Sequence, residues 1–291
     1  MLLLKPIRMK SQLILGFSVM VAIIAIVVFI NLVQVRTALE LSHHITDIHT
    51  PTAENSMMML NGVNQTLAAL QSWMLLGEAK FKQERQEIWA TQVQAPLQEL
   101  KKLSLNWIHP EHIEQLREIK NLLSQLKQFQ QNIEEIAQTP DNMPALKLFF
   151  EQAVSLSNIM SNNITQMIDL ELKQGANPER KALLGMMADV RGTLGLSLAN
   201  IRAFLLSGKS EFRSDFEVLW FKNETRFNDL KSQKNLLTPE QLKAFELFSQ
   251  SRSRFMPLST KMLEMRDQPD WNRGNYWLAS QTAPVTAQLV L

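Results

Sequence analysis

The chain has 291 residues, 45% of them apolar, and a formal net charge of +2 from 30 basic and 28 acidic side chains. This balance excludes the strongly basic surface of a nucleic-acid-binding protein, and the absence of cysteine excludes disulfides, thiolate catalysis and zinc–thiolate sites. Nine glycines and eleven prolines are few for a turn-rich β protein, so the composition favours an all-α fold.

The first element in chain order is a predicted transmembrane helix at residues 11–35. The sequence has no charge between Lys10 and Arg36, and its centre, Leu13–Ile30, is almost entirely apolar. At a rise of about 1.5 Å per residue, about 20 such residues cover most of a hydrocarbon layer about 30 Å thick. The alternatives are a cleaved signal peptide, whose apolar region is only about 7–15 residues long, and a buried soluble helix, which needs neighbours on every side.

Basic residues set the expected orientation of this helix. Lys5, Arg8 and Lys10 precede it with no acidic residue among them. Because basic flanks stay on the cytoplasmic side of a membrane, residues 1–10 are expected in the cytoplasm. The rest of the chain, from a membrane-proximal stalk at residues 36–51 onward, is expected outside, and membrane lipid is one predicted partner.

The remaining sequence contains an internal repeat at an offset of 131 residues. Thr66–Phe81 (TLAALQSWMLLGEAKF) resembles Ser197–Phe212 (SLANIRAFLLSGKSEF). Further shared landmarks, the later ones after a two-residue slip, are Trp89 and Trp220, Pro110-Glu111 and Pro239-Glu240, and Pro140-Asp141 and Pro269-Asp270. Any two amphipathic helices share leucines, but not tryptophan, glycine and proline positions. We therefore predict two homologous helical modules, residues 52–176 and 177–291.

Turn and capping signals divide each module into four helices. Gly77 and Gly208 are predicted C-cap glycines, and Thr238–Gln241 (TPEQ) is a predicted capping box with proline at the first helical position. Gly175–Pro178 is either a turn or a kink in a longer helix. The predicted helices span 55–76, 79–105, 110–138 and 143–174, then 178–207, 209–234, 238–267 and 270–291. The predicted fold is therefore all-α, with a transmembrane helix followed by two four-helix-bundle modules.

Three arginines on the helix at 178–207 form the main candidate ligand site. Arg180, Arg191 and Arg202 are 11 residues apart, so each is rotated by only about 20° from the last. They project within about 60° of the centre of the predicted apolar stripe, which consists of Leu184, Met187, Leu194, Leu198, Ile201 and Leu205. Guanidinium groups turned toward a bundle interior need anionic partners. We predict a site for a small organic anion such as a carboxylate, completed by Trp220, Asn223 and Asn275.

Alternatives to this site stay open. The arginines could reach solvent at the bundle surface or pair with Asp189, Glu217 or Glu224. A separate site in the first module is a further alternative, and its candidate residues are Arg85, Gln71, Trp89 and Gln92. The sequence has no phosphate-binding glycine loop and no metalloprotease or serine-hydrolase motif, so we expect no enzyme: no catalytic residues, no metal site and no cofactor.

Four stretches of the sequence are similar to one known family. The leader MKSQLILGF, which runs into the apolar helix, is followed by NQTLAALQSWMLLGEAKFKQER, MADVRGTLGLSLANIRAFLLSGKSEF and WNRGNYWL. Together they resemble the N-terminal region of methyl-accepting chemotaxis proteins, in the type whose periplasmic part is a helical bimodular sensor domain. The resemblance covers essentially the whole chain.

This resemblance implies a homodimeric chemoreceptor of the bacterial inner membrane with its bulk in the periplasm. Two stacked four-helix modules would sense small molecules, often organic acids, with ligand contact expected in the segment of Arg191 and Arg202. Such receptors continue into a second membrane helix, a HAMP linker and a coiled coil that meets cytoplasmic signalling proteins, so we expect this chain to be part of a longer receptor. The alternatives are a sensor of a histidine kinase or cyclic-dinucleotide enzyme, and a structural membrane protein without a ligand, whose arginines would face solvent or be paired.

Overall fold

The computed structural model describes the backbone of residues 9–289 and all of their side chains except those of residues 9–12, 40, 41, 43 and 44. It is about 90% helical, and none of its described residues forms a strand, which confirms the all-α prediction. Lys5, Arg8 and the side chain of Lys10, which set the expected membrane orientation, lie outside the described part.

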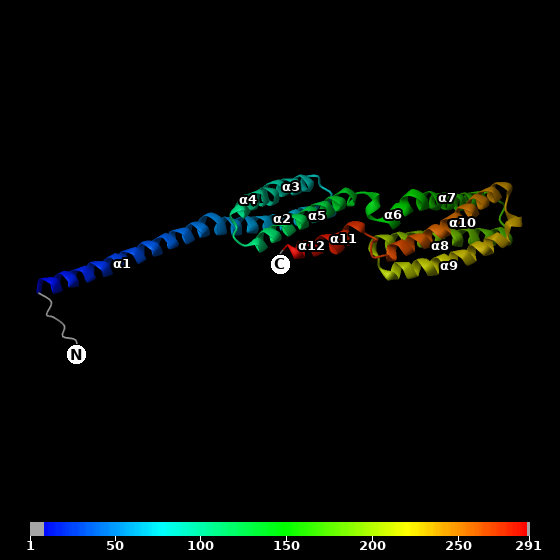
Figure 1. The fold of residues 1–291 in the computed structure, drawn as a ribbon. Coiled ribbons are helices and arrows are strands. Elements are labelled where there is room, and N and C mark those ends of the chain that lie inside the picture. The colour runs from blue at the N-terminus through cyan, green and yellow to red at the C-terminus, as the bar shows by residue number, and fades with distance from the viewer. Residues whose placement is uncertain (1–8, 290–291) are drawn as a thin grey trace, which may run out of the picture. The chain divides into compact units, whose positions relative to one another are not determined.

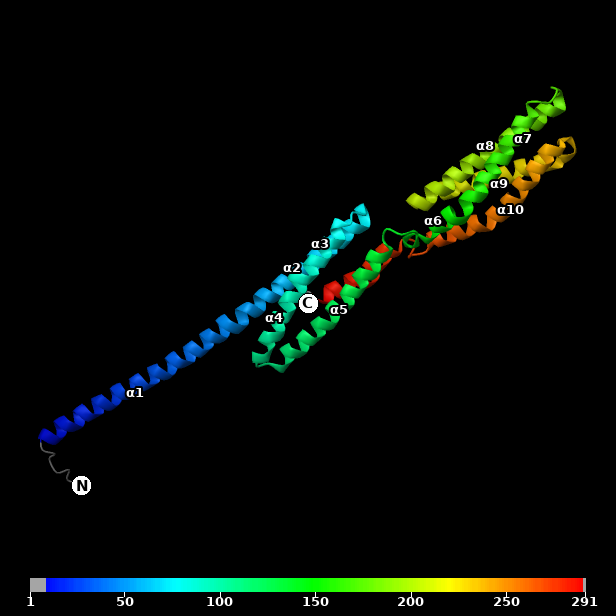
Figure 2. The same ribbon diagram turned by 90° about the horizontal axis from the view of Figure 1, so that it is seen from above.

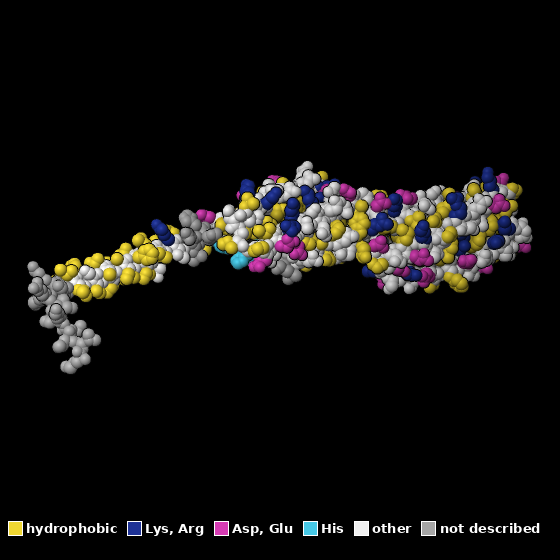
Figure 3. Space-filling view, viewed as in Figure 1, with side chains coloured by type: hydrophobic (Ala, Val, Ile, Leu, Met, Phe, Trp, Pro, Cys, Tyr) yellow, Lys and Arg dark blue, Asp and Glu magenta, His cyan; other side chains and the backbone are white. Residues whose placement is uncertain are grey.

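The N-terminal helix α1 (Met9–His44) exposes its large apolar side chains between Leu13 and Leu39, and Figure 3 shows apolar side chains along the face in view. Its segment Leu13–Leu39 is long and apolar enough to cross a membrane, and none of its most apolar window is buried. The helix α8 (Pro178–Ser207) passes the same test of length and composition, but a third of its window is buried. Leu13–Leu39 could therefore serve as a membrane anchor, whereas α8 is a core helix.

The described chain divides into two compact units. The first contains the described residues up to Ala69 together with residues 80–124 and Leu289, and the second contains residues 70–79 and 125–288. After α1 come the π-helix η1 (Ile45–His49), α2 (Thr50–Leu76), α3 (Lys80–Ile88), the π-helix η2 (Trp89–Gln94), α4 (Ala95–Leu103), the 3₁₀-helix η3 (Ser104–Asn106) and α5 (Pro110–Ile136). The helices α2 and α5 thus contribute residues to both units.

The second unit has a bundle of four antiparallel helices as its core (Figures 1 and 2). The first of the four is a continuous helical stretch of α6 (Pro144–Leu148), the π-helix η5 (Phe149–Ala153) and α7 (Val154–Glu171). The others are α8, α9 (Ser210–Ser232) and α10 (Pro239–Asp267). Their shared core contains Met160, Met167, Met187, Phe227 and Phe248, all buried.

This packing corrects the module boundary predicted at residues 176 and 177. The helix predicted at 143–174 packs in one core with α8, α9 and α10, although the repeat assigns it to the first module. The reason is local: α7 ends at Glu171, and α8 starts at Pro178 after an N-cap by Asn177, so the two helices form an antiparallel hairpin. Gly175–Pro178 is therefore a turn and not a kink.

The secondary structure repeats beyond the sequence landmarks. After the 3₁₀-helix η4 (Pro140–Asn142), α6 begins at Pro144 and η5 at Phe149. The equivalent elements α11 (Arg273–Trp277) and η7 (Leu278–Thr282) begin 129 residues later, and η7 leads into α12 (Ala283–Gln288). This is the offset of Pro140-Asp141 and Pro269-Asp270, so the two copies share a π-helical turn at the same place. The boundaries of the sequence repeat nevertheless differ from those of the packed helix bundle.

Both predicted C-cap glycines are confirmed, and the two copies cap their helices in similar ways. Gly77 and Gly208 have φ of 68° and 69°, the left-handed region that favours glycine. Near Gly77, the amide of Gln138 donates to the carbonyls of Trp73 and Met74, each at 2.9 Å. Near Gly208, Arg266 Nε donates to the carbonyl of Leu205 at 3.1 Å. The capping box predicted at Thr238–Gln241 is also present.

Replacing Gly208 by alanine should lower the free energy of unfolding by about 1–2 kcal/mol, because an L side chain is strained in the left-handed region. The added Cβ would also meet the guanidinium of Arg266. Urea-induced unfolding followed by circular dichroism measures the change.

Gly195→Ala is the matched control on the same helix. A Cβ at Gly195 meets nothing within 4 Å, so this substitution should stabilise the helix by about 0.5–1 kcal/mol. Equal effects of the two substitutions would contradict the C-cap assignment.

Candidate functional site

The structure corrects the inward orientation predicted for two of the three arginines. Arg191 and Arg202 are exposed, and the guanidinium of Arg202 lies 5.4 Å from the ring centroid of Phe149. The buried face of α8 also includes Val190, Thr193, Ser197 and Phe204. These side chains rotate its centre by about 50° away from the predicted stripe, so both arginines reach solvent.

Arg180 is paired inside the protein, at the end of the bundle where α7 turns into α8. Its Nη2 donates to Glu171 Oε2 at 2.7 Å, and its Nη1 donates to the carbonyl of Leu236. The carboxylate of Glu171 is almost fully buried and also accepts from Gln241 Nε2 at 2.7 Å. Arg180 thus ties α7, α8 and the start of α10 together and is not available to a ligand.

Asn275 is the fourth predicted residue that lies away from the site. Its side chain is exposed on α11, and its backbone N–H donates to the N-cap side chain of Asn272 at 3.0 Å. The described residues of α11 and α12 contribute nothing to the core cluster of α7–α10. The predicted fourth helix of the second module therefore does not complete that bundle.

The two remaining predicted residues, Asn223 and Trp220, are brought together in the core. Asn223 is fully buried, and its amide nitrogen donates to the carbonyl of Val190 and to Thr193 Oγ1, both at 2.9 Å. The hydroxyl of Thr193 donates in turn to the carbonyl of Asp189 at 2.7 Å. This polar layer links α8 to α9 within the core.

Arg252 completes the layer from α10, and sequence reasoning missed it. Its side chain is only 8% exposed, and its Nε donates to Asn223 Oδ1 at 3.3 Å. The guanidinium lies over two rings, 4.7 Å from the centroid of Trp220 and 5.0 Å from that of Phe227. The available signal was its position in the buried rhythm Phe245, Phe248, Arg252, Phe255, Ser259 and Met262, where an arginine interrupts a core stripe.

Two hydrogen-bond donors in this layer have no protein partner. Arg252 Nη2 and Trp220 Nε1 are both buried and unpartnered. The nearest anion to Arg252 is Glu224, at 3.8 Å from Nη2, and the side chain of Glu224 is half exposed. Burial lowers the pKa of Arg252 from its usual value, and the charge of Glu224 only partly offsets this effect. A carboxylate placed here would satisfy donors that the fold leaves unpaired.

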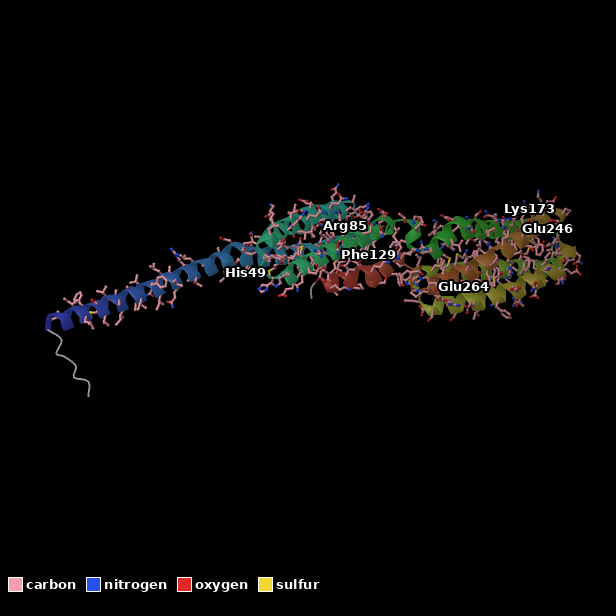
Figure 4. All side chains as sticks on the ribbon, in the orientation of Figure 1. His49, Arg85, Phe129, Lys173, Glu246 and Glu264 are labelled. Carbon is pink, nitrogen blue, oxygen red and sulfur yellow. The ribbon has the colours of Figure 1, made fainter. Side chains whose placement is uncertain are left out.

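A groove between α9 and α10 borders this layer at Trp220 and Glu224, and Arg252 is not among the residues that line it. Its lining includes Trp220 and Glu224 from the layer, together with Phe216, Phe221, Ser259 and Thr260. Figure 4 labels Glu264, which lines the same groove from α10. A small molecule in the groove would touch the indole of Trp220 and the counter-ion of Arg252 directly.

The candidates predicted for the first module do not form a comparable site. Arg85 (labelled in Figure 4) and Trp89 are buried. Gln92 is half-buried, and its backbone lies close to Gly62 of α2. A Cβ at Gly62 would lie 2.7 Å from the carbonyl oxygen of Gln92, so glycine permits this close approach. Gln71 is exposed and belongs to the other compact unit.

A second cavity lies in the first unit, beside the stalk. It is lined by His49, His109 and His112 with Trp107 and apolar side chains of α4 and α5. Figure 4 labels His49 at this end of α2. Among the described residues, none of the buried, unpartnered polar atoms lies in this cavity. The α9–α10 groove is therefore the stronger candidate site.

Comparisons with protein-family models, with curated proteins and with solved structures gave no match to this chain.

Replacing Glu171 by alanine should lower the free energy of unfolding by about 2–3 kcal/mol, because it leaves the partly buried Arg180 without its anion. It also removes the acceptor of Gln241. Chemical denaturation of the full chain measures the loss.

Glu211→Ala is the control, because Glu211 pairs with Lys209 at 3.9 Å while both side chains are exposed. This exposed pair should contribute less than about 0.5 kcal/mol. A similar small effect at Glu171 would show that the buried pair does not hold the end of the bundle.

Proposed function

We propose that this chain is the ligand-sensing part of a transmembrane receptor that binds a small organic anion in the α9–α10 groove. The observation behind this proposal is the pair of buried, unpartnered donors, Arg252 Nη2 and Trp220 Nε1, beside a groove open to solvent. Burial of an incompletely satisfied charged group is costly, so a ligand that completes its hydrogen bonds would stabilise the bundle.

Glu224 has the role of an exchangeable counter-ion in this proposal. In the free protein it lies 3.8 Å from Arg252, beyond hydrogen-bond distance, and its own side chain is 52% exposed. A ligand carboxylate can take its place with two short, charge-assisted hydrogen bonds, because a guanidinium presents paired donors to a planar carboxylate. Glu224 then returns to water at little cost.

Ligand binding would act on α10. Pro257 lies inside α10, five residues after Arg252, and it cannot donate a hydrogen bond to the carbonyl of Ser253. A helix bends most easily at such a position. An anion that pulls Arg252 away from Asn223 changes the balance between two packings of α10 against α8 and α9, which is the kind of small helix displacement a receptor transmits.

The apolar segment Leu13–Leu39 would hold this sensor in the membrane. Together with the resemblance to methyl-accepting chemotaxis proteins, it supports a homodimeric chemoreceptor of a bacterial inner membrane with a periplasmic sensor region. In the full receptor the displacement would reach cytoplasmic signalling proteins.

The ligand proposal predicts a thermal shift. Small carboxylates at 100 times their dissociation constant should stabilise the detergent-solubilised chain by about 2.7 kcal/mol. Arg252→Gln should abolish this stabilisation, because it removes the charge that pairs with the carboxylate. Differential scanning fluorimetry against a panel that includes acetate, lactate and butyrate measures both.

Arg191→Gln is the matched control, because Arg191 is an exposed arginine outside the polar layer. It should leave the shift intact. If no carboxylate stabilises the wild type, or if Arg252→Gln keeps the full shift, the proposed site is wrong.

The anchor proposal predicts the location of the chain in cells. The full chain should fractionate with bacterial membranes and resist extraction by alkaline carbonate. Removal of residues 1–39 should release the protein, because Leu13–Leu39 is the segment apolar enough to cross a membrane. A C-terminal alkaline phosphatase fusion should be active if the bulk is periplasmic. Recovery of the intact chain from the soluble fraction would contradict the anchor.

A further inference from the structure

The lining of the α9–α10 groove has more acidic than basic side chains. It includes the carboxylates of Glu217, Glu224 and Glu264 and one guanidinium, that of Arg213. Arg213 is already paired, with Glu217 at 3.0 Å and with Asp267. No ion pair between described residues includes Glu264. The end of the groove that holds Glu217 and Glu264 therefore favours a cationic group.

The floor of the same groove has the opposite character. Trp220 lines the groove and is 96% buried. Its Nε1 is a buried hydrogen-bond donor without a partner in the protein. Arg252 lies against the indole ring, with its own Nη2 unpartnered. These two donors are independent evidence, separate from the Glu217 and Glu264 carboxylates of the protein. A ligand carboxylate would supply the acceptor that they lack.

The distance along the groove between the Glu217–Glu264 end and the Trp220–Arg252 end follows from the antiparallel pairing of α9 and α10. The ion pairs Arg213–Asp267 and Glu224–Arg252 mark two levels along the groove. Glu217 on α9 and Glu264 on α10 both lie next to the first level. At about 1.5 Å per residue, Trp220 is about 4.5 Å further along from Glu217, and Glu224 is about 10 Å along.

The walls between these levels suit an ammonium group and a short carbon chain. Phe216, Trp220 and Phe221 present aromatic rings, and Ser259 and Thr260 present hydroxyls. A cation held by carboxylates beside aromatic faces gains from both the charge and the ring quadrupoles. A methylene chain along the rings would fill the space between the charged ends.

We propose that the ligand of this groove is an amino carboxylate whose ammonium and carboxylate groups are separated by a short carbon chain. This inference rests on the anion site of the proposed function and names its ligand class. The carboxylate binds Arg252 and Trp220, and the ammonium binds Glu264 and Glu217.

The test compares three probes of similar length on the full chain in detergent: 4-aminobutyrate, butyrate and butylamine. Isothermal titration calorimetry should show 4-aminobutyrate binding about tenfold more tightly than butyrate, since one added charge-assisted hydrogen bond gives at least this factor. Butylamine, which lacks the carboxylate, should bind more weakly than both.

Two variants separate the inference from the proposed function. Glu264→Gln should bring the affinity for 4-aminobutyrate down to that for butyrate and leave butyrate binding unchanged or tighter. Arg252→Gln should abolish the binding of both carboxylates. Glu246→Gln, an exposed substitution on α10 outside the groove (labelled in Figure 4), is the matched control and should change neither affinity.

The outcomes are distinguishable. If butyrate binds as tightly as 4-aminobutyrate, or if Glu264→Gln affects both probes equally, the amino group is not recognised and this inference is wrong, while the anion site stands. If neither carboxylate binds, both proposals fail.

Discussion

Burial of the Arg252 guanidinium in the core of the α7–α10 bundle is the constraint around which the second unit is organised. A charge in an apolar core requires polar neighbours, and Asn223 and Thr193 supply them from two other helices. The guanidinium also lies over the rings of Trp220 and Phe227. The layer remains incomplete, since Arg252 Nη2 and Trp220 Nε1 lack acceptors. This incomplete layer is the basis of the proposed anion site.

The internal repeat and the packing follow different boundaries. The repeat pairs α6, η5 and α7 with α11, η7 and α12, whereas the core joins α7 with the first three helices of the second copy. A duplicated sequence keeps its local signals in each copy, such as the left-handed glycines and the π-helical turns. The duplication does not determine which helix becomes the fourth helix of a bundle. Here α7 takes this position, because a short turn after Glu171 joins it to α8 and the two helices pack together.

The candidate site shows where reasoning from helical periodicity succeeds and fails. Trp220 and Asn223, two of the predicted site residues, lie on the buried face of α9. The predicted stripe of α8 omits the buried residues Val190, Thr193, Ser197 and Phe204, so it is centred too close to Arg191 and Arg202. The hydroxyls of Thr193 and Ser197 donate to backbone carbonyls, which lets these polar side chains pack in the core.

The sequence by itself determined the features that depend on neighbouring residues along the chain. These are the apolar N-terminal helix, the helix boundaries set by Gly77, Gly208 and Thr238, and the repeat. Only the tertiary structure decided that Arg180 pairs with Glu171, that Arg252 faces Asn223, and that Arg252 Nη2 and Trp220 Nε1 are left without acceptors. These pairings join residues on different helices. Their partners depend on how each helix is rotated against its neighbours, which the summed packing of all four determines.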